Sequence, residues 1–208
     1  MLDTIRNMIT GVFPDVWPVI IIITVIACSL RLAYIIKYHE KFCFYKEIFS
    51  LIFILYVMCL FEVVTIQDNN YGLSNFVPFA EMFRYDFGSR LFIRNIIGNI
   101  LLFLPYGYFT SYYLNSKKIA PIALLTIIVS LTIECVQLKI GRTFDIDDVI
   151  LNTCGGIIGC LMYNFVDTFS NKLPKVFKTD GFINFLVIIL LIIVIIYVFN
   201  INLLNWVN

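Results

Sequence analysis

Apolar residues are grouped along the chain in long runs that are separated by short polar segments. A helix needs roughly 17–25 mostly apolar residues to cross a lipid bilayer. None of the runs alternates between apolar and polar residues with a period of two, and irregular loops or open sheet edges cannot face lipid. The pattern therefore predicts an all-α, polytopic integral membrane helical bundle of about six transmembrane helices, at residues 17–36, 48–66, 95–113, 119–138, 149–166 and 182–199.

The residues before the first run have a different pattern. Apolar residues within 2–13 recur at helical spacing on one face: Leu2, Ile5, Ile9, Val12 and Phe13. This spacing predicts a short helix that lies in the membrane interface, and the alternative is a frayed terminus. We therefore expect three parts: an interfacial helix at 1–16, a membrane core of five spans at 17–166, and a C-terminal span and tail at 167–208.

Composition supports a membrane protein and excludes other classes. The chain is 61% hydrophobic and 14% charged, whereas soluble domains are about 45–50% apolar and about 25% charged. A soluble enzyme, a disordered chain and a nucleic-acid binder are excluded, and the net charge of +1 provides no large electrostatic surface. The six cysteines form no CxxC pair, so we interpret them as small apolar residues and expect no disulfide framework, metal site or cofactor.

Loop charges predict the orientation. The segments after the first, third and fifth spans are rich in lysine and poor in acids, whereas the opposite side carries acids alongside its arginines. By the positive-inside rule, the lysine-rich side is cytoplasmic and both termini are external. These lysines are Lys37, Lys41, Lys46, Lys117, Lys118, Lys172, Lys175 and Lys178.

Polar residues inside the spans gather at one end of the predicted bundle. Such residues are costly in a membrane and mark a functional site or a structural contact. They occur at the end of the second span, the start of the third, the end of the fourth and the start of the fifth, which alternation of span direction puts at one membrane face. The candidate ligand-binding residues are Arg94, Asn95, Asn99, Glu134, Gln137, Arg142, Asp145, Asp148 and Asn152.

Structural interpretations of these residues stay open. Asp148 is placed to cap the fifth span, Arg142 to form an ion pair with an acid, and the asparagines to bond neighbouring helices. No feature of the sequence explains why Asp147 accompanies Asp148, and one of the two could face water. We assign structural roles, a kink or close helix contact, to Pro105, Gly107, Gly155 and Gly159.

Several motifs resemble the VanZ-like family. Residues 95–107 match its N-x-x-x-N-x-x-x-F-x-P-x-G signature, and residues 75–79 match its N-x-x-P-F segment. The series Glu134-x-x-Gln137, Arg142-x-x-Asp145-x-x-Asp148, Asn152 and Gly155/Gly159 follows in the family's order, so the resemblance covers roughly residues 20–166. It implies a bacterial membrane protein of a kind associated with resistance to teicoplanin and related lipoglycopeptides, or one with another role in the cell envelope.

Three hypotheses for function follow, and whether the protein is an enzyme stays open. We favour a non-enzymatic binder whose outer-leaflet pocket takes a lipid headgroup or a lipid-linked cell-wall precursor; we assign no catalytic residue, and protein partners are unknown. The second hypothesis is an intramembrane enzyme with Glu134 as general base and acids including Asp145 and Asp148 holding a divalent cation. The third is a proton-coupled lipid transporter that uses Glu62 and Glu134.

Overall fold

The computed structural model describes residues 2–65, 74–80 and 82–207, with side chains described for 17–62, 74–80, 82–194 and 196. Almost all of this chain is helical, and the described residues contain no β-strand beyond a single bridge between Asn75 and Asp145. The structure therefore confirms the all-α prediction. Its helices are α1 Leu2–Tyr38, α2 Phe44–Thr65, α3 Arg90–Phe92, α4 Gly98–Leu114, α5 Ile119–Lys139, α6 Ile146–Lys172 and α7 Asp180–Val207.

Among the described residues, five helices are long and apolar enough to cross a membrane, and they correspond to the first five predicted spans. The predicted sixth span, 182–199, falls in α7, but only part of α7 has described side chains, so its crossing stays a prediction. The backbone of residues 2–13 is helical as the start of α1, and its position in the interface likewise stays a prediction. The five candidate spans are Trp17–Tyr38, Phe44–Glu62, Arg90–Leu114, Ile119–Lys139 and Ile146–Lys172.

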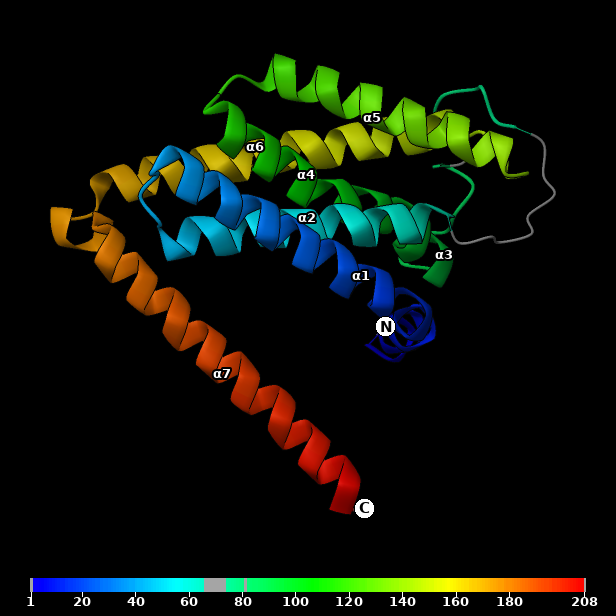
Figure 1. The fold of residues 1–208 in the computed structure, drawn as a ribbon. Coiled ribbons are helices and arrows are strands. Elements are labelled where there is room, and N and C mark those ends of the chain that lie inside the picture. The colour runs from blue at the N-terminus through cyan, green and yellow to red at the C-terminus, as the bar shows by residue number, and fades with distance from the viewer. Residues whose placement is uncertain (1, 66–73, 81, 208) are drawn as a thin grey trace. The chain divides into compact units, whose positions relative to one another are not determined.

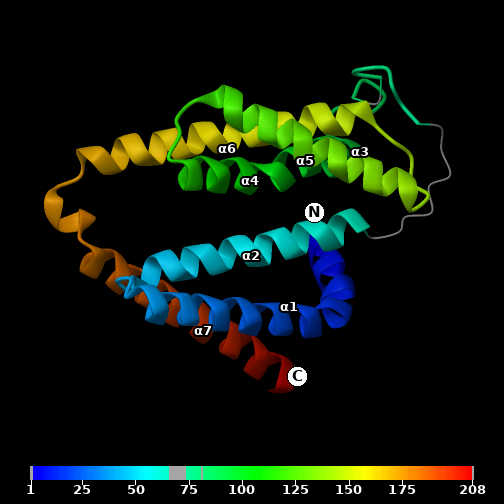
Figure 2. The same ribbon diagram turned by 45° about the horizontal axis from the view of Figure 1, so that its top comes forward.

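The chain forms two compact units, and the predicted polar cluster belongs to the first. The first unit comprises residues 1–16 and 56–168, and the second comprises 17–55 and 169–208. Within the first unit, α4, α5 and α6 run side by side, as Figures 1 and 2 show.

Glycines bring α4 and α6 into backbone contact. A Cβ on Gly155 would lie 2.3 Å from the carbonyl oxygen of Ile100, and one on Gly159 would lie 2.1 Å from that of Leu104. From the other side, a Cβ on Gly107 would lie 2.0 Å from the carbonyl oxygen of Gly156. Small residues at such positions let helix backbones approach closely, which is a main source of helix association in membranes. These glycines therefore fix the distance between α4 and α6.

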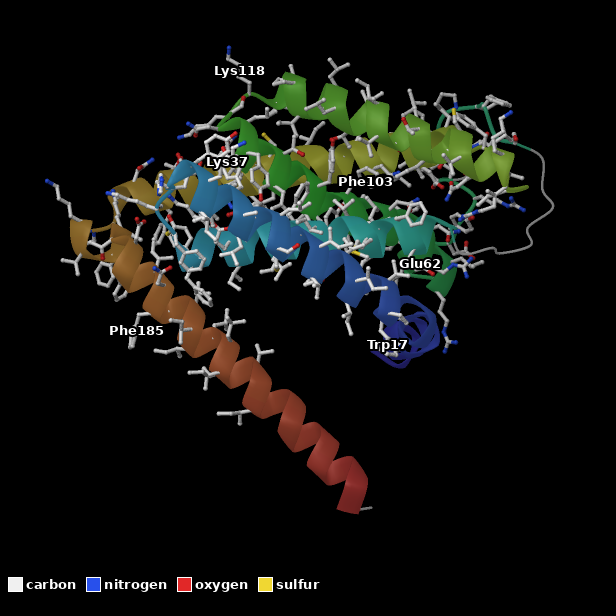
Figure 3. The ribbon with its side chains drawn as sticks, in the orientation of Figure 1. Trp17, Lys37, Glu62, Phe103, Lys118 and Phe185 are labelled. Atoms are coloured by element: carbon white, nitrogen blue, oxygen red, sulfur yellow. The ribbon has the colours of Figure 1, made fainter. Side chains whose placement is uncertain are left out.

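An aromatic core fills the space beside this contact. Phe103 of α4 is fully buried and packs with Leu60 and Tyr56 of α2. The Tyr56 hydroxyl also donates to the carbonyl oxygen of Leu102, at 2.8 Å. Figure 3 shows Phe103 among the helices, with Glu62 and Lys118 toward opposite ends of the first unit.

The third span begins one turn earlier than predicted and contains a π-helical turn. Ser89 caps α3 by accepting from the Phe92 backbone N–H, at 3.1 Å. The next five residues, Ile93–Ile97, form a π-helix (η1), in which the Gly98 N–H bonds to the Ile93 carbonyl. A π turn inserts an extra residue per turn, so residues before it are rotated relative to those after it. Asn95 lies within this π turn, and Asn99 follows it in α4.

In the second unit, a charged cluster holds the connection between α1 and α2. The Arg31 guanidinium bonds both carboxylate oxygens of Glu47, at 2.9 and 3.0 Å, and pairs with Glu40 at 3.1 Å. At the start of α2, the Tyr45 backbone N–H donates to the Asn184 side chain of α7, at 2.9 Å. Arg31 therefore has acidic partners that compensate for its place in a spanning helix.

Candidate functional site

A cavity of about 100 Å³ lies in the first unit at the end where the sequence gathers its polar residues. This volume has room for several water molecules or a small polar group. Helices α4, α5 and α6 and the loop before α6 supply its wall. The lining residues are Asn99, Leu102, Phe103, Ile133, Glu134, Gln137, Arg142, Asp148 and Asn152, which include six of the nine predicted site residues.

The end of α5 directs Arg142 toward this cavity. The Arg142 backbone N–H bonds to the Gln137 carbonyl at 2.9 Å, and the Gly141 N–H bonds to the Leu138 carbonyl at 3.4 Å. This is the Schellman arrangement of a helix C-terminus, which needs a residue with positive φ just after the cap. Gly141 fills that position with φ +91°. The glycine therefore ends α5 and returns the chain so that Arg142 and Gln137 share the cavity wall.

Glu134 links the cavity to the loop between α5 and α6. Its side chain is 2% exposed, and its Oε2 accepts the backbone N–H of Asp145 at 2.9 Å. The charges of Arg142 and Asp145 both act on this carboxyl group. Glu134 thus has a structural bond on one oxygen while its side chain faces the cavity.

Three acidic residues at the start of α6, Asp145, Asp147 and Asp148, have different hydrogen-bond partners. Asp145 caps the helix, because its Oδ1 accepts the Asp147 backbone N–H at 2.9 Å. The same oxygen accepts from the Asn75 side chain at 2.9 Å. Asp148 instead lines the cavity and accepts a hydrogen bond from the Asn99 side chain. The capping role that the sequence offered for Asp148 is filled by Asp145.

Asp147, left without a role by the sequence, holds a loop. It is 1% exposed, and its carboxylate accepts the backbone N–H of Phe79 and, at 3.1 Å, that of Met82. Asn75 ties the same loop to the segment before α6 through backbone bonds with Phe144 at 2.8 Å and Ile146 at 3.0 Å. The N-x-x-P-F segment is therefore fastened to the loop that carries Arg142. In the sequence, the one indication of a structural role for Asp147 is its position in the first turn of α6, a helix that Asp145 already caps.

Asn152 of α6 also lines the cavity. Its Nδ2 donates to the Ser130 hydroxyl at 2.8 Å, while its Oδ1 is buried and has no hydrogen-bond partner among the described residues. Ser130 belongs to a row of buried polar residues along one face of α5, of which only Glu134 and Gln137 are among the predicted site residues. Spacings of four, four and three residues, followed from Gln137 toward the N-terminus of α5, could have revealed the whole row: Thr126, Ser130, Glu134 and Gln137.

Two further predicted residues lie away from the cavity wall. Arg94 is exposed, and its Nε donates to the Asn95 side chain at 3.2 Å. Asn95 in turn donates to the Tyr85 hydroxyl at 2.8 Å. Both lie in the π turn that directly precedes α4. Within the described residues, no three His, Cys, Asp or Glu side chains are grouped so as to hold a metal ion.

Comparison with known proteins identifies the family. The model of the VanZ/LLP1 family matches residues 47–167, more than half of the chain. The chain belongs to the VanZ/LLP1 family. Protein VanZ of Enterococcus faecium is 28% identical over 150 residues, which cover 71% of this chain and 85% of the relative. No solved structure matches the chain. The VanZ/LLP1 match includes every residue of the cavity wall.

We predict that Asp147→Ala releases the fastened loop of this VanZ/LLP1 protein. Two partly buried backbone N–H groups, those of Phe79 and Met82, would lose their acceptor, and each unpaired group costs about 1–3 kcal/mol. The free energy of unfolding should fall by at least about 2 kcal/mol, and amide hydrogen exchange of residues 74–80 should accelerate. Asp86→Ala serves as the control, because Asp86 is exposed in the same connection. Unchanged exchange in Asp147→Ala would show that other contacts hold the loop.

Proposed function

We propose that this VanZ/LLP1 protein binds the polar headgroup of a lipid, or of a lipid-linked cell-wall precursor, in the cavity at the outer leaflet of the bacterial cytoplasmic membrane. By occupying or reorganising the precursor, it lowers the access of teicoplanin and related lipoglycopeptides to their target. The family resemblance and the relative named Protein VanZ support the link to glycopeptide resistance.

The observation that carries this proposal is the composition of the cavity wall. Charged and amide side chains from three helices face one small space, and Asn152 keeps a buried acceptor atom without a partner. A buried polar group without a partner costs free energy, and a ligand with a matching donor removes that cost. Glycine contacts hold α4 and α6 in place and so preorganise the wall.

Binding to purified protein in nanodiscs tests the proposal. Wild-type protein should bind a lipid-linked cell-wall precursor saturably, without turning it over or transporting it. The variant Asn99→Leu, which removes a polar group from the wall, should weaken this binding about tenfold, the effect of losing a hydrogen bond to a charged group. Leu101→Ala is the matched control, because Leu101 is exposed beside the wall residue Leu102. Equal precursor binding by wild type and Asn99→Leu would contradict the proposal.

One observation favours an alternative function as a proton-coupled lipid transporter. Two carboxyl groups, those of Glu134 and Asp148, face the same cavity, and each acts electrostatically on the other. Such a pair is suited to taking up and releasing a proton. Uptake of labelled lipid across proteoliposomes that depends on a proton gradient would favour this alternative over simple binding.

The proposal requires the cavity end of the first unit to face outward. Cysteine introduced in place of Phe87, which is 92% exposed, should react with an impermeant maleimide in intact cells, in a background without the six native cysteines. Cysteine in place of Lys118, at the lysine-rich end, should react only after the cells are opened. The reverse labelling pattern would show that the cavity opens to the cytoplasm.

A further inference from the structure

Four residues of the cavity wall, Asn99, Glu134, Asp148 and Asn152, together offer a ligand more hydrogen-bond acceptors than donors. The Asn99 Nδ2 is engaged by Asp148, and the Asn152 Nδ2 is engaged by Ser130. One N–H of each amide is therefore used within the protein. Acceptors that a ligand can meet include carboxyl oxygens of Glu134 and Asp148 and the partnerless Oδ1 of Asn152, whose side chain is 4% exposed.

The charged groups of the wall likewise favour a positively charged ligand. Glu134 and Asp148 contribute two acidic groups, whereas Arg142 contributes one guanidinium. Arg142 acts on both acids, and the acids act on each other. In a partly buried site, an added positive charge is attracted to such a pair more strongly than in bulk water. An anion placed between the two acids would be repelled.

We propose that the cavity selects a primary ammonium group carried by a lipid headgroup. This inference rests on the proposed function and specifies the chemistry of its ligand. The ammonium has three N–H donors, which match the acceptors on Glu134, Asp148 and Asn152. A phosphate or carboxylate a few bonds away then meets the guanidinium of Arg142, whose planar fork suits such groups.

Other headgroup chemistries satisfy this wall less well. A trimethylammonium carries the charge but has no N–H donor, so the buried oxygen of Asn152 would stay without a partner. A headgroup with hydroxyls and a phosphate supplies donors but no positive charge for the two acids. The primary ammonium can arise from an ethanolamine phospholipid or from an aminoacyl phospholipid, and the two share the same recognition.

A methylation series tests the selection directly. Native mass spectrometry of the detergent-solubilised full chain can measure the apparent Kd of the first bound short-chain phospholipid. Affinity should fall stepwise from phosphatidylethanolamine through its N-methyl and N,N-dimethyl forms to phosphatidylcholine, with at least about a tenfold total loss. Lysyl-phosphatidylglycerol and phosphatidylethanolamine, compared in competition, distinguish the two sources of the ammonium, and both should exceed unmodified phosphatidylglycerol.

The outcomes separate this inference from the proposed function. Equal affinity along the methylation series, or tighter binding of phosphatidylglycerol, would overturn the ammonium selection while headgroup binding stands. If neither these phospholipids nor a lipid-linked precursor bound saturably, both would be overturned.

A pair of variants assigns the selection to Asn152. Asn152→Leu removes the unpaired acceptor and should reduce the ethanolamine-to-choline affinity ratio about tenfold. Ser130→Ala removes the partner of Asn152 but leaves that acceptor, and should retain the ratio. Because a ratio is measured within one sample, a partly inactive preparation does not change it. An unchanged ratio in Asn152→Leu would overturn the role of this residue.

Discussion

Alanine in place of Gly107 is expected to destabilise the first unit more than any other single methyl group added to α4. The new Cβ would lie 2.0 Å from the Gly156 carbonyl oxygen and 2.7 Å from its Cα, so two helix backbones would have to separate. Backbone atoms cannot rotate away as a flexible side chain can. We expect the free energy of unfolding in detergent to fall by at least about 3 kcal/mol, measured by thermal or chemical denaturation.

Gly98→Ala is the matched control in the same helix. Its Cβ would meet only the Ile93 carbonyl oxygen, at 3.8 Å, which is an ordinary contact. Because alanine is the better helix former by about 1 kcal/mol, this variant should be neutral or slightly stabilised. Similar stability of Gly107→Ala and Gly98→Ala would mean that α4 and α6 are not in backbone contact at Gly107.

Glu134→Ala is expected to abolish ligand binding and the associated glycopeptide phenotype, whereas Glu134→Gln should retain part of both. The alanine variant leaves the Asp145 backbone N–H without its acceptor and thereby frees the loop that carries Arg142. Glutamine keeps an acceptor oxygen for that N–H and nearly the same shape. We expect binding to weaken at least about a hundredfold for alanine and about tenfold for glutamine, in line with the cost of unpaired buried groups.

The measurement is precursor binding in nanodiscs and the change in teicoplanin sensitivity, both at matched membrane expression. If Glu134→Gln were as inactive as Glu134→Ala while its loop stayed protected in hydrogen exchange, the residue would be acting through its proton. That result would contradict simple binding and favour the proton-coupled alternative. Hydrogen exchange near Asp145 provides the control for loop structure.

Much of this fold follows from the hydrophobic pattern, because a membrane restricts the chain to helices of a set length. The five candidate spans differ from the predicted ranges mainly at their ends. The predicted third span begins at residue 95, directly after Arg94, whereas Ser89 caps a helix that begins at Arg90. The cap at Ser89 therefore lets the helical segment begin at Arg90 and continue through Arg94, although both residues are charged.

The site was predictable where residue spacing and span direction suffice. Glu134 and Gln137 lie one helical turn apart, and alternation of the spans brings Asp148 and Asn99 to the same end. Two features needed three-dimensional structure. Asn95 lies in a π turn and bonds to Tyr85 rather than lining the cavity, and a single inserted residue of this kind leaves no mark in the apolar pattern. The bonds of Asp147 join residues 65 or more positions apart, which no local pattern encodes.

Photocrosslinking from the cavity wall in membranes tests most directly whether the cavity binds a lipid-linked precursor. A small diazirine-bearing aliphatic residue at Leu102, which lines the cavity, is compared with the same residue at Leu101, which is 57% exposed. We predict that position 102 crosslinks to the lipid-linked precursor, that Glu134→Ala removes this crosslink, and that position 101 crosslinks only to bulk phospholipid. Precursor crosslinks of equal yield at both positions, or at neither, would contradict headgroup binding in the cavity.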